Sequence, residues 1–143
     1  LQWRQQYTNK GAALSVKQLD NLMELVQPKK EFKTRMLVKI GDQIRFIPLT
    51  EVAYFYAEDN EVMLTTFDKK RHIIDFSLDQ LTMSINPHDF YRLNRGILAN
   101  KQAIGKVHRY FNSRLKIELT PEINTEVLVS RVKVSGFLEW MEA

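Results

Sequence analysis

The sequence predicts a mainly β domain with a few short helices, preceded by a linker. From Phe32 onward, apolar and polar residues alternate with a period of two, which is typical of half-buried strands. Gly, Asn, Asp and Pro residues separate these runs, as they do in turns between antiparallel strands. Helical periodicity in this part of the chain is confined to residues 77–85 and 130–141, so we expect helices to be a minor component.

Residues 1–31 are predicted to form a linker that contains a helix at about 15–27. Ser15 followed by Gln18 matches a capping box, and apolar residues then recur at helical spacing until Pro28. This helix packs either on its own domain or, as a connector, on an upstream domain or a second copy of the chain. The pattern leaves both arrangements open. Because the chain begins with Leu1 and not with Met, we expect it to belong to a longer protein.

The strands are predicted from short alternating runs and the turns between them. Residues 36–40 and 44–47 flank the turn at 41–43 and should form a hairpin. The run Val52–Ala57 is dense in β-branched and aromatic residues and fits a central strand. Further strands are expected at 62–67, 72–76, 104–111, 115–119 and 127–129, and in the apolar halves of the stretch 90–100.

The two short helices are predicted from their first residues and their apolar spacing. Ser77 with Gln80 forms a second capping box, and the helix that it opens should end at Asn86-Pro87. Ser130 is expected to cap a final helix. The apolar stripe of that helix would consist of Val134, Phe137, Leu138 and Met141.

The stretch Phe90–Asn100 contains a polar island between two apolar runs. The island is Asn94-Arg95, and Gly96 behind it would let the backbone turn. The apolar runs anchor the backbone on both sides, so the two planar side chains should project from the fold. Arginine pairs bidentately with guanine and asparagine with adenine, so both side chains suit the edges of bases.

Positive charge is concentrated around this stretch. The whole chain has a net charge of +4 at pH 7, but no Asp or Glu lies between Asp89 and Glu118. Such a run is either a solvated positive face or a surface for a polyanion, and the near balance of charge in the whole chain favours the polyanion. Its seven basic residues are Arg92, Arg95, Lys101, Lys106, Arg109, Arg114 and Lys116.

The composition argues against an enzyme and against a metal or cofactor site. The absence of Cys excludes disulfides, thiolate metal ligands and Cys nucleophiles. His72, His88 and His108 have no His or carboxylate partner at i+3 or i+4 on a predicted helix, and no Gly-rich phosphate loop is present. No apolar run approaches the ~20 residues of a membrane span. We therefore expect a cytoplasmic, non-enzymatic protein without cofactors.

Four blocks of residues follow one another in a characteristic order: Ile47–Asn60, Phe76–Leu81, Phe90–Asn100 with Ile104 beyond it, and Val129-Ser130-Arg131 before the terminal helix. In this order they resemble the LytTR family, the DNA-binding output domains of many bacterial response regulators. The third block is the most specific. The resemblance runs from about Phe32 to the C-terminus, so we expect one LytTR-like domain at 32–143.

The resemblance implies small antiparallel sheets packed side by side with short helices, and loops that enter the DNA grooves in place of a recognition helix. The implied function is sequence-specific binding of double-stranded DNA by the output domain of a transcriptional response regulator in two-component phosphorelay signalling. Residues carried over as base contacts are Asn60, Asn94, Arg95 and Arg131. Residues expected to contact phosphate are Arg92, Lys101, Lys106, Arg109 and Arg114.

The chain departs from the family pattern at two positions, and structural roles remain open for several residues. Gly96 stands where Ser or Thr is frequent, so a hydroxyl contact to phosphate would be lost. Asn94 stands where His is frequent, so the preferred base would differ. Asn60 could instead hold a turn, Arg131 could cover apolar surface with its stem, and Arg92 could pair within the fold.

The expected partners are double-stranded DNA with repeated half-sites, an upstream receiver domain, and a second copy of the chain on DNA. The competing interpretation is a module that binds RNA or protein with the same basic face. Exposed aromatic side chains that stack on unpaired bases would favour RNA. Tyr110 and Phe111 lie within the basic run, but their strand pattern favours a place in the core.

Overall fold

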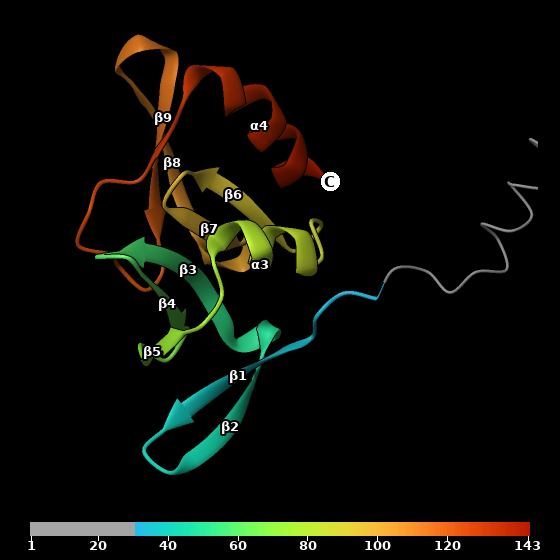
Figure 1. The fold of residues 1–143 in the computed structure, drawn as a ribbon. Helices are drawn as coiled ribbons and strands as arrows, with labels where there is room; N and C mark the ends of the chain where they lie inside the picture. Colours follow the sequence, from blue (N-terminus) through green and yellow to red (C-terminus); the bar gives the residue numbers. More distant parts are fainter. Residues whose placement is uncertain (1–30) are drawn as a thin grey trace, which may run out of the picture. The chain divides into compact units, whose positions relative to one another are not determined.

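The computed structural model describes residues 31–143, of which Phe32–Ala143 form one compact unit. The helix predicted at 15–27 lies outside the described residues. Within the described unit, strands β1 to β10 form three antiparallel sheets, and helices are short (Figure 1). The predicted fold of small antiparallel sheets with short helices is confirmed.

A two-stranded hairpin of β1 (Arg35–Ile40) and β2 (Gln43–Pro48) begins the unit. Its turn contains Gly41 with a φ of +58°, a left-handed conformation that glycine adopts without strain. The side chains of Met36 and Val38 are buried, whereas the paired residues Leu37 and Phe46 lie on the exposed face. The hairpin is therefore anchored to the unit by one face only.

The middle of the unit is a five-stranded sheet in the order β5-β4-β3-β7-β6. As predicted, Val52–Ala57 is its central strand. Phe55 pairs with Leu64 on one side and with Leu98 on the other, so three large apolar side chains form a row across the sheet. The strands are β3 (Val52–Glu58), β4 (Glu61–Thr66), β5 (Arg71–Ile74), β6 (Phe90–Asn94) and β7 (Ile97–Asn100).

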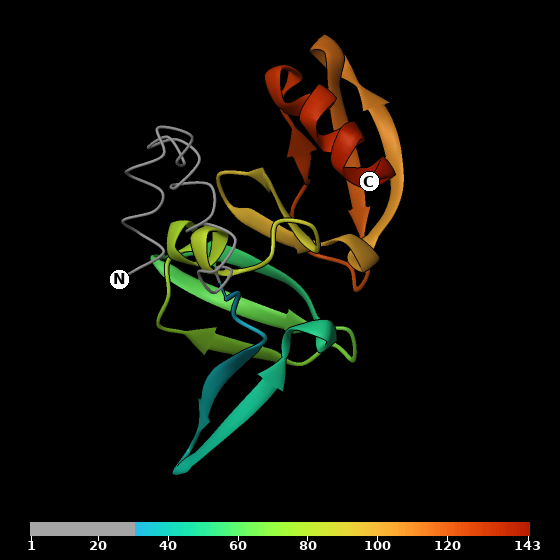
Figure 2. The same cartoon turned by 90° about the vertical axis from the view of Figure 1, so that its right-hand side faces the viewer.

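Each face of this sheet is covered by different elements. On the Phe55 face lie β1 and the helix α3 (Leu78–Ser84), whose predicted capping box between Ser77 and Gln80 is present. On the opposite face lie the three-stranded sheet β10-β9-β8 and the helix α4 (Val134–Glu142), which enclose Tyr54 and Tyr56. The three strands are β8 (Ile104–Tyr110), β9 (Arg114–Leu119) and β10 (Leu128–Val129). The β1–β2 hairpin and the tip of the β8–β9 hairpin lie at opposite ends of the unit in both views (Figures 1 and 2).

The final helix differs from the prediction at its start and in its buried face. Ser130 makes no side-chain cap, because a 3₁₀ turn, η4 (Arg131–Lys133), comes first and α4 begins at Val134. Leu138 is 46% exposed, whereas Trp140 is buried, stacks on Tyr91 with ring centroids 5.0 Å apart, and donates its indole N–H to the carbonyl oxygens of Pro87 and His88. These contacts of Trp140 turn the helix so that its buried side is centred on Phe137 and Trp140.

Candidate nucleic-acid interface

The polar island predicted at 94–96 is the turn between β6 and β7. Ile97, at the start of β7, pairs with Tyr56 near the end of β3, and the backbone N–H of Ala57 donates to the Gly96 carbonyl at 2.9 Å. This register places the β6–β7 turn beside the turn Asp59-Asn60 that joins β3 to β4. Two of the predicted contact regions, the β3–β4 turn and the β6–β7 turn, therefore lie at the same end of the strands of the five-stranded sheet.

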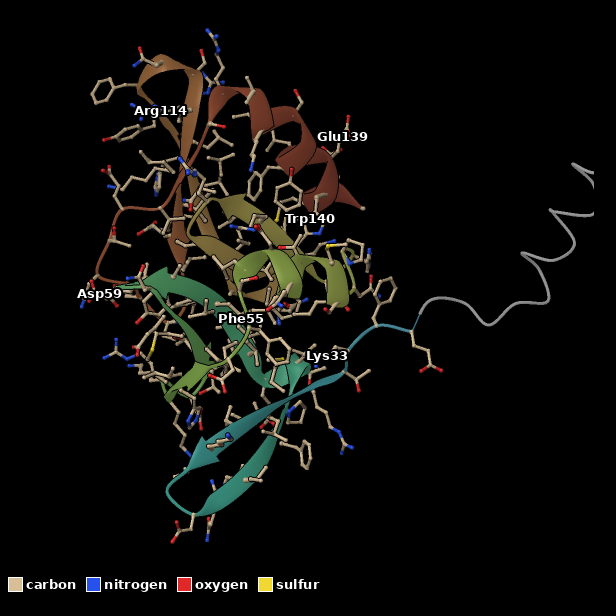
Figure 3. The ribbon with its side chains drawn as sticks, viewed as in Figure 1. Lys33, Phe55, Asp59, Arg114, Glu139 and Trp140 are labelled. Carbon is tan, nitrogen blue, oxygen red and sulfur yellow. The ribbon has the colours of Figure 1, made fainter. Side chains whose placement is uncertain are left out.

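Asn60 is exposed and also holds a tight turn. Its φ is 64° and that of Asp59 is 51°, so both residues of the β3–β4 turn are left-handed, a conformation that Asn and Asp tolerate better than most residues. Figure 3 shows Asp59 at the tip of this hairpin. The turn role that the sequence left open is present, and it leaves the Asn60 side chain accessible to a ligand.

The guanidinium of Arg92 is used within the fold. Its Nε donates to the Asn94 carbonyl at 2.9 Å, and its Nη2 donates to the Arg95 carbonyl at 2.6 Å. Its Nη1 lies 2.9 Å from the Asp79 carboxylate in α3. Arg92 thus ties the β6–β7 turn to α3, which is the internal pairing that the sequence offered as the alternative to a phosphate contact.

The side-chain amide of Asn94 is also occupied at both ends. Its Oδ1 accepts the Gly96 N–H at 2.8 Å, and its Nδ2 donates to the Leu128 carbonyl of β10 at 3.0 Å. Each end of the amide keeps one further hydrogen-bonding position, so a contact to adenine would have to use the second Nδ2 hydrogen and the second Oδ1 lone pair from this fixed orientation. In this arrangement Asn94 joins the β6–β7 turn to β10.

Arg131 lies just beyond β10, beside the tip of the β8–β9 hairpin. Val129 pairs with Leu115, so the chain that follows β10 reaches the level of the turn at 111–113. Figures 1 and 2 both show the start of α4 next to this tip. The Arg131 side chain is exposed and makes no hydrogen bond or ion pair with any described residue.

Four basic side chains, located on the β6–β7 turn, near the end of β8 and in η4, are exposed and make no hydrogen bond or ion pair with residues 31–143. Arg95 follows β6, Arg109 lies near the end of β8, and Arg131 and Lys133 belong to η4. Sequence reasoning missed Lys133 because it lies outside the acid-free run. The alternation Arg131-Val132-Lys133 directly after a strand is the signal that could have found it.

Carboxylates partly offset the positive charge on the outer face of the three-stranded sheet. His108 Nε2 lies 2.8 Å from the Glu118 carboxylate, and this hydrogen bond lowers the pKa of Glu118 below its usual value. Lys116 lies 3.8 Å from Glu126. Arg114 donates its Nε to the Phe111 carbonyl and stacks over the Tyr110 ring, 5.1 Å from its centroid. The strongest unpaired charge is therefore at the end of this sheet and not on its outer face.

Comparison with known proteins identifies this arrangement. The family model of the LytTr DNA-binding domain matches residues 42–142. The chain belongs to the LytTR family. An uncharacterised response regulatory protein of Vibrio cholerae is 26% identical over 108 residues, which are 71% of this chain and 40% of that protein. The chain thus spans less than half of this relative.

A solved structure has the same fold. It is the LytTr DNA-binding domain of a Bacillus cereus protein described as a methyl-accepting/DNA response regulator, with a TM-score of 0.66. The match covers 78% of this chain and 99% of that domain at 19% identity. The match confirms the LytTR fold that the sequence blocks predicted.

Two lysines of the basic run lie at the other end of their strands in this LytTR domain. Lys101 follows β7 at its Asn100 end, where its Nζ lies 3.2 Å from the Ala143 carbonyl and 5.0 Å from the centroid of the Trp140 ring. Lys106 is near the beginning of β8, away from the tip. The seven basic residues between Asp89 and Glu118 therefore do not form a single surface.

Phe111 and Gly96 differ from their sequence-based interpretation. Phe111 is 74% exposed because the chain turns there through Asn112 and Ser113, both with a φ of 59°, so its assignment to the core was wrong. Gly96 has no left-handed φ, and a Cβ there would meet only Asn94 Oδ1 at 3.6 Å. The turn therefore does not require glycine, and it has room for the hydroxyl residue that the family often carries.

The described residues hold neither a metal-binding cluster nor a membrane-spanning helix. Between residues 31 and 143 no three His, Cys, Asp or Glu side chains gather in a way that could hold a metal ion. In the same range, no helix is long and apolar enough to cross a membrane.

Proposed function

We propose that this LytTR domain binds double-stranded DNA sequence-specifically, as the output domain of a transcriptional response regulator in two-component signalling. One observation carries the proposal. Arg95 and Arg131 are exposed and unpaired on two turns that are 36 residues apart in sequence and are joined by the Asn94–Leu128 hydrogen bond of 3.0 Å, at one edge of the fold. Because the Vibrio cholerae relative is longer, a receiver domain upstream of this chain belongs to the same proposal.

The proposed roles follow from which side chains are free. Arg95, Arg131 and Asn60 are accessible and suit base edges, since arginine forks match guanine and asparagine matches adenine. Contacts with phosphate fix the position of a protein on the duplex without reading the sequence. For these we propose the basic residues that surround the two arginines, namely Arg109, Arg114 and Lys133.

Replacing either arginine should weaken binding to the preferred site and relax its sequence. We expect Arg95→Ala and Arg131→Ala each to cost about 1–3 kcal/mol of binding free energy and to lose preference at one base pair. The preferred site is first selected from a random duplex library, and affinities are then measured for it and for all single-base variants. The matched control is Arg45→Ala, because Arg45 is exposed on β2 in the hairpin at the opposite end.

The pattern of affinities separates the possible roles of each arginine. If Arg95→Ala lowers preferred and scrambled affinity equally, Arg95 contacts phosphate and the proposed division of roles is incorrect. An early thermal melt would assign Arg95 a structural role, although its exposed side chain argues that stability should be unchanged.

We also propose that two copies of the domain occupy repeated half-sites about one helical turn apart. The isolated chain should then be monomeric or weakly dimeric and should add to a two-site duplex in two steps. Sedimentation velocity of the free chain and titration of duplexes with one or two half-sites measure this. A tight dimer in the absence of DNA, or a stoichiometry of one on the two-site duplex, would contradict the arrangement.

RNA binding is the second candidate function, and the exposure of Phe111 favours it. An exposed ring beside Arg109 and Arg114 could stack on an unpaired base. Competition of labelled duplex DNA with single-stranded DNA and RNA of the same sequence distinguishes the two candidates. The RNA candidate requires that RNA competes better than duplex and that Phe111→Ala removes this advantage.

A further inference from the structure

We infer that Asn94 is a positioning residue that holds the Arg95 turn and the Arg131 turn in one fixed geometry, and that it does not itself read a base. The inference rests on the proposed function, in which Arg95 and Arg131 read bases. It replaces the direct base contact that the sequence suggested for Asn94.

The β6–β7 turn is held from three directions. Its backbone bonds to β3 through Gly96, and Arg92 binds the Asn94 and Arg95 carbonyls while anchored to Asp79. Neither of these supports reaches β10. The third support, the Asn94 amide, does so through the Leu128 carbonyl.

The bond to Leu128 spans two different sheets. β6 is an edge strand of the five-stranded sheet and β10 is an edge strand of the three-stranded sheet. Among the described residues, Asn94 Nδ2 to Leu128 O is the one hydrogen bond between the β6–β7 turn and β10. The position of Arg131, three residues after Leu128, relative to Arg95 therefore depends on this side chain and on apolar packing.

Base recognition is sensitive to that relative position. A side chain that reads a base must be held within roughly 0.5 Å of its productive geometry by the residues around it. Two arginines on separate sheets meet this condition on one duplex only if the sheets keep a fixed offset. Loss of the Asn94 bond should therefore reduce discrimination more than general affinity.

Two substitutions test the hydrogen-bond acceptor and the hydrogen-bond donor of the Asn94 amide separately. Asn94→Asp keeps the acceptor for the Gly96 N–H but removes the donor to Leu128, so the β6–β7 turn stays formed and β10 is released. Asn94→Ala removes both bonds. Asn124→Asp is the matched control, because it adds the same charge on an exposed loop residue that makes no hydrogen bond with described residues.

The first measurement is discrimination at the base pairs assigned to each arginine by Arg95→Ala and Arg131→Ala. We expect Asn94→Asp to lose about tenfold discrimination at the Arg131 base pair and to stay within about twofold of the original protein at the Arg95 base pair. Asn94→Ala should lose discrimination at both, and Asn124→Asp at neither. Full discrimination in both Asn94 variants overturns the inference. So does a loss at a third base pair that neither arginine substitution affects, because Asn94 would then read that base directly.

The second measurement uses the free protein and does not depend on DNA. Amide hydrogen exchange in residues 128–133 should rise about fivefold or more in Asn94→Asp, while exchange in residues 95–97 stays unchanged. Unchanged exchange in 128–133 overturns the inference even if the original protein shows no sequence preference. A lack of preference in the original protein contradicts the proposed function instead. If Asn94→Ala does not fold, Asn94→Asp alone carries both measurements.

Discussion

The affinity for duplex DNA should fall about thousandfold when salt rises from roughly 50 to 200 mM, with a log–log slope of about −4 to −6. Each phosphate that a basic side chain neutralises releases condensed counterions, and the released ions make binding weaker at higher salt. About five to seven phosphate contacts give this slope. Arg109, Arg114 and Lys133 are the proposed phosphate contacts, and the base-reading Arg95 and Arg131 bring two further positive charges into the grooves, so five cations are available for the lower end of that range.

Single substitutions should show how much each basic residue contributes to the salt dependence of DNA affinity. Arg109→Ala and Lys133→Ala should each make the log–log slope shallower by about one and weaken all sequences alike. Lys101→Ala and Lys106→Ala will do the same only if the duplex extends to the other end of β7 and β8, where these lysines lie. Affinities at several salt concentrations give the slopes. A slope near zero in the original protein would mean that this end of the fold does not face a polyanion.

The parts of the fold that the sequence predicts are those decided by near neighbours in the chain. The capping box of α3 depends on Ser77 and Gln80, three residues apart, and both hydrogen bonds are present. The turn at Gly41 likewise depends on one residue with a left-handed φ. The central position of β3 followed from its apolar residues alone, because a strand buried on both faces contains few polar residues.

The roles that the sequence could not predict depend on distant contacts. Nothing near Asn94 shows that its amide meets Leu128, a residue 34 positions away in the chain. Arg92 is a basic residue in a basic run, and its partners are the nearby carbonyls of Asn94 and Arg95 and, from the distant helix α3, the Asp79 carboxylate. The rotation of α4 depends on the stacking of Trp140 against Tyr91, which belongs to a different element. In each case a side chain that fits a ligand is used by the fold, or a side chain that fits the core is left exposed.

Phe137→Ala should lower the free energy of unfolding by about 3–5 kcal/mol, a large part of the stability of a domain of this size. Phe137 is fully buried, and its ring lies 6.0 Å from that of Tyr91 and 6.1 Å from that of Trp140. Removing it leaves a cavity between α4 and the five-stranded sheet. Because α4 directly follows η4, the substitution should also loosen Arg131 and weaken DNA binding at temperatures where the domain is still folded.

Leu138→Ala is the matched control, since it removes a similar apolar side chain from the next position of the same helix. Leu138 is 46% exposed, so its loss should cost about 1 kcal/mol or less. Urea denaturation at constant salt, followed by tryptophan fluorescence and circular dichroism, gives both free energies. Equal losses from the two substitutions would place Leu138 in the buried stripe that the sequence spacing predicts, and would mean that α4 is not rotated toward Trp140. A large loss at Phe137 alone would show that the buried face of α4 is centred on Phe137 and Trp140 and that Leu138 lies outside it.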